Sequence, residues 1–169
     1  MADATEQFAR FKALIATAEP PLLGPQQRVG VATVEELSSK LTMFFARENI
    51  SPQVQSLLKC AALLWHDHFD ASHTLSQDIG TRDGSWLHGI MHRREPDYGN
   101  AKYWFHRVGP HPAFSELAAR IGRKSWDPFA FVDDCEAAEQ GNDTAFTDSL
   151  RALQAAEFDV LVEHISQNA

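Results

Sequence analysis

The chain has 169 residues, of which 44% are hydrophobic and 22% are charged, a composition typical of one globular domain and not of a disordered tail. Its 15 basic and 23 acidic residues give a net charge of −8. This charge excludes general binding to nucleic acids or anionic membranes, because both depend on a positive surface.

No apolar run approaches the roughly 20 residues that span a bilayer. The N-terminal residues lack the basic region and apolar segment of a secretory signal, so we expect a cytoplasmic protein. The two cysteines, Cys60 and Cys135, fall within helical patterns and form no C-x-x-C motif. We therefore expect two packed, reduced thiols.

Helices are expected from the first residues of the chain onward. Apolar residues spaced by three and four positions predict a helix over 3–18, followed by a loop rich in proline and glycine. Thr33 and Glu36 form the pattern of a capping box, which predicts a second helix that begins there and ends near residue 49.

The longest helix is expected over about 52–79. Ser51 supplies an N-cap and Pro52 occupies the first helical position. Around residues 57–65 the sequence is apolar on nearly every side of the helix, which places this helix at the centre of the fold. His68 falls in its apolar stripe and is interpreted as a core histidine.

The second half of the chain has start and stop signals at short intervals. Caps, prolines and glycines predict helices over 86–94, 98–108, about 112–122, 128–141 and from about 143 towards the C-terminus. No alternating run of β-branched residues is long enough for a sheet. The sequence therefore predicts an all-α protein, a single-domain bundle over residues 1–169 around the long helix.

Histidine, tryptophan and tyrosine are concentrated between Trp65 and His111. This stretch holds seven of the eight histidines, three of the four tryptophans and both tyrosines. Imidazole and indole groups are costly to bury without a hydrogen-bond partner, and a solvated helical surface has little need for so many of them. We therefore locate the candidate site in this stretch.

Two blocks within the stretch carry a resemblance. They read W-H-D-H-F-D-A-S-H from Trp65 and H-G-I-M-H-R-R-E-P-D-Y-G-N-A-K-Y-W from His88. In these blocks the chain resembles a family of small, uncharacterised, mostly bacterial proteins. The resemblance implies the location of a site, and it implies no activity, cofactor or partner.

On the long helix, His66, Asp70 and His73 are separated by four and three positions and would share one face. Asp70 could orient either histidine and raise its pKa, as a general base requires. Lys59 and Gln55 continue the same face, however, so a solvated polar surface explains the pattern equally well.

His88 and His92 are one helical turn apart, with Glu95 three residues further on. Two imidazoles at this spacing can bind one metal ion, with a carboxylate from Glu95 or Asp70. The spacing is common, and the H-E-x-x-H protease signature is absent because Gly89 stands at its glutamate position. We therefore assign no metal ligand from the sequence and keep metal binding as an alternative.

A polar corner follows, where two short helices meet. Guanidinium, amide and hydroxyl groups at such a corner can bind a small anion. The structural alternative is that arginine–carboxylate pairs lock the corner and that Asp97 caps a helix. The residues expected to bind a ligand are Arg93, Arg94, Asp97, Tyr98 and Asn100, together with Trp65 and Trp104.

The leading functional hypothesis is a protein that binds a small polar or anionic molecule, with histidine acid–base chemistry if it is an enzyme. One alternative is a metal-dependent hydrolase or oxygenase that uses His88 and His92, and another is a non-enzymatic interaction module. No cofactor is assigned, and both a monomer and a homo-oligomer stay open. The expected catalytic residues are His66, Asp70, His73, His88, His92 and Glu95.

The short connection over residues 80–85 predicts that the long helix and the next one are antiparallel neighbours. Axes of packed helices lie about 8–10 Å apart, so side chains on facing surfaces can reach one ligand. We therefore predict that at least two of the three polar residues of the long helix reach the histidines of the next helix, around a cavity open to solvent.

Overall fold

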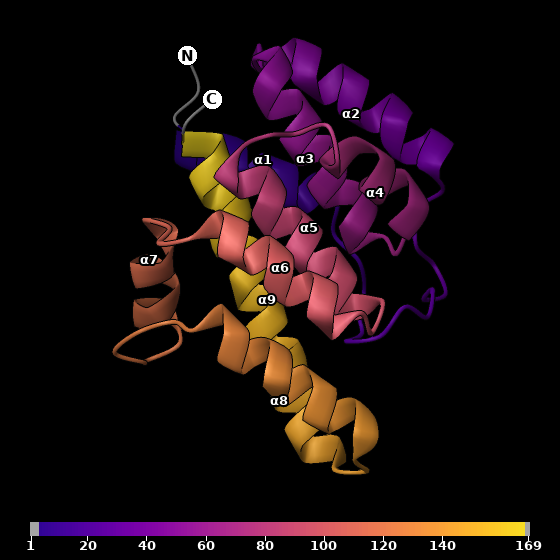
Figure 1. The fold of residues 1–169 in the computed structure, drawn as a ribbon. Coiled ribbons are helices and arrows are strands. Elements are labelled where there is room, and N and C mark those ends of the chain that lie inside the picture. The colour runs from indigo at the N-terminus through magenta and orange to yellow at the C-terminus, as the bar shows by residue number, and fades with distance from the viewer. Residues whose placement is uncertain (1–3, 168–169) are drawn as a thin grey trace.

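The computed structural model describes residues 4–167, and within this range every regular element is an α-helix (Figure 1). The prediction of an all-α fold is therefore confirmed. The helices are α1 (Ala4–Leu14), α2 (Val34–Glu48), α3 (Pro52–Trp65), α4 (Phe69–Ser76), α5 (Arg82–Arg94), α6 (Tyr98–Val108), α7 (Ala113–Arg120), α8 (Pro128–Gln140) and α9 (Thr144–Gln167).

Most helix starts follow the capping signals in the sequence. The Thr33 hydroxyl accepts a hydrogen bond from the backbone N–H of Glu36, whose carboxylate accepts one from the backbone N–H of Thr33. The carboxylates of Asp97 and Asp127 cap α6 and α8 in the same way. Each cap satisfies N–H groups that the first turn of a helix leaves without a partner.

The single helix expected over about 52–79 is instead two helices, α3 and α4. Asp67 lies between them with φ of 64°, in the left-handed region. The backbone N–H of His68 donates to Leu63 O at 2.9 Å, and that of Asp67 donates to Leu64 O at 3.2 Å. These two bonds form a Schellman motif, a common helix end in which glycine usually occupies the left-handed position.

Asp67 replaces glycine at this position because its carboxylate holds two arginines. Arg28 Nε donates to Asp67 Oδ2 at 2.8 Å, and Arg94 Nη2 donates to Oδ1 at 2.7 Å. The side chains of Asp67 and Arg94 are almost fully buried. The kink is therefore fixed by contacts to the N-terminal loop and to α5, and no local sequence signal announces it.

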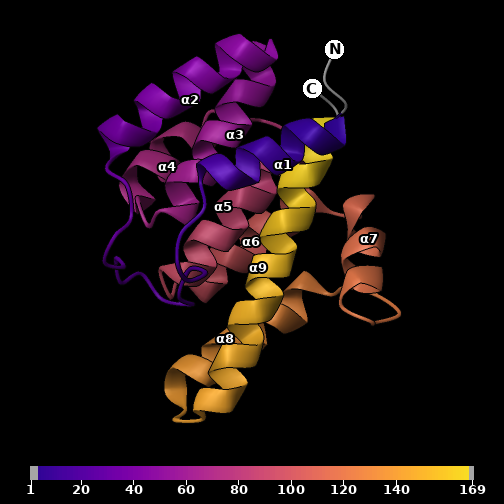
Figure 2. The same ribbon diagram turned by 180° about the vertical axis from the view of Figure 1, so that it is seen from behind.

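The central helix of the bundle is α5, and it begins earlier than expected. The Thr81 hydroxyl accepts a hydrogen bond from Gly84 N at 3.1 Å, so Thr81 is the N-cap and the helix begins at Arg82, where the sequence predicted a start at residue 86. Every residue from Gly84 to Arg94 is buried. In Figure 1, α3, α4 and α6 surround α5, and Figure 2 shows α9 along the opposite side.

Cys60 and Cys135 are both buried and are not joined to each other, as the sequence predicted. Within residues 4–167, none of the helices combines the length and the apolar composition needed to cross a bilayer.

Candidate functional site

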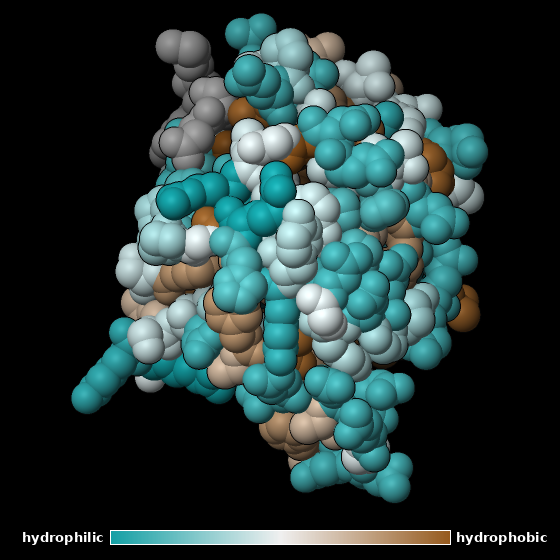
Figure 3. All heavy atoms as spheres, in the orientation of Figure 1, coloured by the Kyte–Doolittle hydropathy of each residue, from teal (hydrophilic) through white to brown (hydrophobic). Residues whose placement is uncertain are grey.

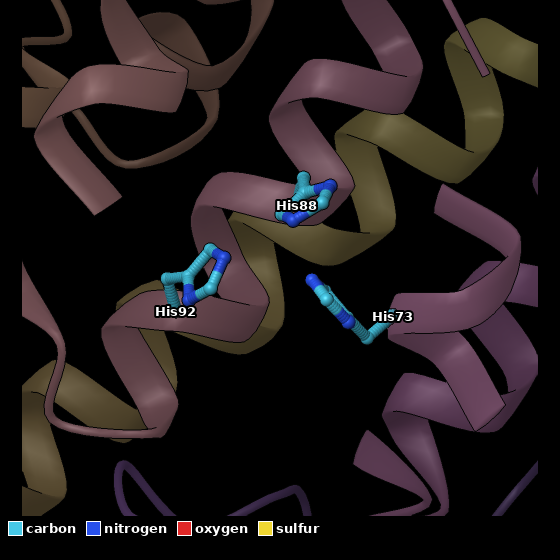
Figure 4. Close-up of side chains that lie close together, drawn as sticks. All are labelled: His73, His88 and His92. Atoms are coloured by element: carbon cyan, nitrogen blue, oxygen red, sulfur yellow. The ribbon is translucent and has the colours of Figure 1, made fainter. Parts of the chain in front are cut away.

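Three histidines from two helices converge between α4 and α5. His73 extends from α4 towards His88 and His92, which lie one turn apart on α5 (Figure 4). One ring nitrogen from each histidine lies within 4.8 Å of those of the other two. The ring of His73 is nearly perpendicular to both others, with centroids 4.8 Å from His88 and 5.6 Å from His92.

A serine hydroxyl lies on the Nδ1 side of the His88 ring. Ser76 Oγ donates to the backbone oxygen of His73 at 3.2 Å. It also lies 3.1 Å from His88 Nδ1, whose N–H it can accept while its own proton is on the His73 oxygen. In this tautomer the lone pair of the neutral ring is on Nε2.

His92 has carboxylates on its Nδ1 side. Glu95 Oε2 lies 3.4 Å from His92 Nδ1, and Asp97 Oδ2 lies 3.9 Å from the same atom. The Asn100 amide nitrogen is 3.4 Å from Nδ1 and 3.2 Å from Nε2, so it can donate to Nε2 when the ring is protonated at Nδ1. In this tautomer the lone pair of His92 is on Nε2, next to Asn100.

The third histidine is unrestrained and accessible. Within the described part of the chain, the His73 imidazole has ring contacts but no hydrogen bond, and it is half-buried where His88 and His92 are buried. Its ring can therefore turn toward the other two at little energetic cost.

The electrostatic environment keeps His88 and His92 neutral. Burial, with the neighbouring His92 and His73, lowers the pKa of His88 from 6.5 to about 4. Burial also lowers the pKa of His92, although Asp97 acts in the opposite direction. Burial raises the pKa of Glu95, with a contribution from the nearby carboxylate of Asp70. Neutral imidazoles are the form of histidine that binds metal ions.

Helix α6 closes the site on one side. The Trp104 ring stacks on His88 with centroids 3.8 Å apart and planes 15° apart. The Arg107 guanidinium lies over the Trp104 ring, 5.1 Å from its centroid. Asn100 and Trp104, both expected to bind a ligand, are thus part of this site.

The predicted cavity open to solvent is not among five surface hollows of the described residues. These hollows have volumes of about 200 to 460 Å³, and none of the five is lined by His73, His88 or His92.

His66 does not belong to this site, and the expectation that it shares a face with Asp70 and His73 is wrong. His66 Nε2 lies 3.0 Å from Ile15 O, and its Nδ1 accepts the N–H of Ala32 at 3.0 Å. The kink at Asp67 turns α4 away from the line of α3, which separates His66 from the other two.

Of the three polar residues expected to reach α5, only His73 contacts its histidines. The carboxylate of Asp70 is exposed and, within the described residues, forms no ion pair or hydrogen bond with them. The predicted antiparallel pairing thus brings one side chain of the set, not two, to the candidate site.

The two adjacent arginines, which were expected to bind a ligand, have their hydrogen-bond partners inside the fold. Arg93 is fully buried and donates to Glu157 Oε2 at 2.6 Å and to Gln154 Oε1 at 3.3 Å. Arg94 donates to Asp67, as described, and to the backbone oxygens of Leu22 and Leu64. Ion pairs inside the fold occupy both guanidinium groups.

Trp65 and Tyr98 also lie away from the cluster. Trp65 Nε1 donates to Thr17 Oγ1 at 3.0 Å, and its ring packs on Phe158 with centroids 4.7 Å apart. Tyr98 lines a separate hollow between α6, α8 and α9. His68, interpreted as a core histidine, is half-buried, and its Nε2 lies 2.7 Å from Ala32 O.

Asp83, His111 and His164 form a second group whose ligand atoms lie within 4.8 Å of one another. Here His111 Nδ1 accepts the backbone N–H of Ala113 at 3.2 Å, so Nε2 must carry the proton of the neutral ring. Nε2 lies 3.0 Å from Asp83 Oδ1, to which it donates. His111 therefore has no lone pair to offer a metal ion, in contrast to His88 and His92.

Sequence reasoning missed two groups of residues. Ser76 was not selected, although its position three residues after His73 on one helix face was a usable signal. Glu157 and Gln154 are the buried partners of Arg93, and no pattern in the sequence of α9 marks them as buried polar residues.

In comparisons with protein-family models, curated proteins and solved structures, no match to this chain was found.

Proposed function

We propose that the protein binds one divalent transition-metal ion through His73, His88 and His92 and acts as a metal-dependent hydrolase on a small polar substrate. The observation that carries this proposal is the convergence of three imidazoles, two of which have an oxygen atom near their Nδ1 nitrogen. Histidines that bind metal ions almost always donate their second ring N–H to such an oxygen. Ser76 Oγ lies in this position for His88, and the Glu95 carboxylate lies 3.4 Å from Nδ1 of His92.

The donor set fits an ion of the zinc class. Imidazoles suit zinc, copper, iron and nickel, whereas magnesium and calcium prefer oxygen ligands. Tetrahedral coordination at 2.0–2.1 Å places ligand nitrogens about 3.3 Å apart. The nitrogens here lie within 4.8 Å, so a small rotation of the half-buried His73 side chain would complete the set.

Three protein ligands leave one coordination position open, which is the arrangement of catalytic zinc sites. An ion bound there would supply Lewis acidity to a substrate oxygen. Glu95 and Asn100, beside His92, are the groups placed to orient a polar substrate. Hydrolysis is favoured over oxygenase chemistry because three imidazoles differ from the two histidines and one carboxylate of non-haem iron oxygenases.

Metal-free acid–base chemistry is the second candidate. It is supported by the pair of His92 and Glu95, in which a carboxylate lies on the Nδ1 side of an imidazole as in many general bases. Arg107, over Trp104 at the edge of the site, could then hold an anionic substrate. This candidate predicts activity that is insensitive to chelators.

The interaction module has less support. The exposed large hydrophobic side chains among the described residues are Val29, Met43 and Tyr103, on three different segments. On the face shown in Figure 3, hydrophobic residues form small areas separated by hydrophilic ones. A binding surface for another protein usually needs a larger continuous patch.

Elemental analysis of protein purified without chelator tests the proposal. We expect about one zinc, iron or manganese per chain, lost in His73→Ala and in His88→Ala. The control is His106→Ala, which removes an exposed histidine that packs against Phe129 away from the cluster. Equal metal content in all three variants, or metal-free protein that ignores added zinc, would contradict the proposal.

A further inference from the structure

A hollow of about 280 Å³ lies on the other side of α6 from the histidines. Tyr98 and Asn100 are two residues apart on this helix and therefore point about 200° apart. Asn100 faces His92, and Tyr98 faces the hollow. Residues 22–26 of the N-terminal loop and side chains of α8 and α9 complete its walls. The volume is at the small end of the range for ligand pockets.

The loop that forms one wall is held in place by the protein itself. Leu22 O accepts hydrogen bonds from Arg94 Nε at 2.9 Å and from Gln154 Nε2 at 3.1 Å. Pro20 O accepts one from Arg151 Nη2 at 2.9 Å. A preformed wall lowers the entropy lost on binding, so the hollow can bind a small molecule without first folding around it.

Two opposite charges line this hollow without pairing with each other. Arg151 Nη1 lies 3.7 Å from the mostly exposed carboxylate of Asp148 and Nη2 donates to Pro20 O, whereas its buried Nε has no hydrogen-bond partner within the described residues. Glu139 lines the same hollow and, within the described residues, forms no ion pair or hydrogen bond. The Nε group of Arg151 and the carboxylate of Glu139 are therefore available to a ligand that carries a negative and a positive group.

The rest of the lining combines apolar side chains with three polar residues, Gln26, Tyr98 and Thr147. Tyr98 is half-buried, and its hydroxyl has no hydrogen-bond partner among residues 4–167. Burial, with Glu139, raises the pKa of Tyr98 to about 12, so the hydroxyl remains a donor at neutral pH. The apolar side chains of Leu22, Leu23, Pro25, Pro96 and Ala138 line the remaining wall.

We propose that this hollow binds a free amino acid with an apolar side chain, or a zwitterion of the same size. Its carboxylate would accept hydrogen bonds from Arg151 and Tyr98, because a guanidinium fork matches a carboxylate. Its ammonium group would pair with Glu139, and its side chain would lie against Leu22 and Pro96. The proposal does not depend on the metal site.

Three related ligands test it on the unaltered protein. L-Phenylalanine carries both charges, 2-phenylethylamine lacks the carboxylate, and 3-phenylpropionate lacks the ammonium group. In ¹H–¹⁵N NMR titrations at neutral pH with chelator present, L-phenylalanine should shift the amide signals of residues 22–26, 98 and 151. Each analogue should bind about tenfold more weakly, since each lacks one charge-assisted contact.

Two variants assign the charges. Arg151→Gln should abolish the preference for L-phenylalanine over 2-phenylethylamine, and Glu139→Gln should abolish its preference over 3-phenylpropionate. The control is Arg120→Gln, because Arg120 pairs with Glu116 and Glu163 outside the hollow. If a variant does not fold, the comparison of the three ligands on the unaltered protein still tests the proposal.

Equal binding of the three ligands would overturn the proposal, because it would mean that neither charge is recognised. Absence of shifts at the highest concentration of L-phenylalanine that dissolves would overturn it as well. Shifts confined to the amides of the histidine cluster would assign the ligand to the other site and would have the same consequence.

Discussion

At the scale of single residues, the chemistry of the candidate site depends on which ring nitrogen carries a proton. Ser76 and Glu95 lie on the Nδ1 side of His88 and His92, where each can accept the N–H and leave the lone pair on Nε2. At His111 a backbone N–H has the opposite effect. The histidine cluster and the group around His111 have ligand atoms at similar distances, but they therefore differ in whether they can bind a metal ion.

Replacing Ser76 by alanine should weaken zinc binding about 10- to 100-fold, the range found when partners of metal-binding histidines are removed. The loss arises because His88 can then adopt either tautomer. Competition with a coloured chelator measures the affinity. Thr74→Ala is the matched control, since Thr74 is exposed on the same helix and donates only to Asp70 O. Unchanged affinity in the Ser76 variant would refute this role.

At the scale of helices, the kink between α3 and α4 decides which histidines meet. The caps of Thr33, Asp97 and Asp127 could be predicted because each cap lies within a few residues of the groups that it satisfies. The kink could not, because Asp67 is stabilised in a left-handed conformation by Arg28 and Arg94, which are distant in sequence.

Replacing Asp67 by asparagine should lower the free energy of unfolding by about 3–5 kcal/mol, the cost of removing one partner of a buried ion pair. Asparagine tolerates the left-handed region, so the loss reports the charge and not the backbone. Urea unfolding measures it, with the exposed Asp70→Asn as control. Similar stabilities of the two variants would show that the pairs with Arg28 and Arg94 do not hold the kink.

The same dependence on distant contacts explains which parts of the candidate site could be predicted. The density of histidines in the sequence indicated the stretch in which the cluster lies, and the spacing of His88 and His92 is visible there. The third histidine of the cluster could be identified only once the kink had separated His73 from His66. Arg93 and Arg94 looked like ligand-binding groups because nothing local marks their distant partners.

At the scale of the whole molecule, the buried histidines make stability depend on pH. The pKa values of His66, His88, His92 and His164 are all lowered, chiefly by burial. Between pH 6.5 and the lower pKa values that these histidines have in the folded state, the unfolded chain binds more protons than the folded one. Stability should therefore fall as the pH decreases through this range.

For metal-free protein we expect a lower free energy of unfolding at pH 5 than at pH 7. The drop in the pKa of His88 from 6.5 to about 4 corresponds to a loss of about 3 kcal/mol in the free energy of unfolding, which is complete once the pH is well below 4. Glu95, with a raised pKa, acts in the opposite direction. Urea unfolding in chelator measures the difference, and His88→Gln should reduce it. Stability that rises on acidification would contradict this account.

The central claim is that α4 and α5 together bind one ion through three imidazoles. X-ray absorption spectroscopy of the zinc-loaded protein tests it most directly, because it counts the ligands and measures their distances. We predict three imidazole nitrogens at 2.0–2.1 Å and one further light atom, with two imidazoles in His73→Ala. A zinc ion with fewer than two imidazoles, or with the same imidazole count in His73→Ala, would contradict the claim.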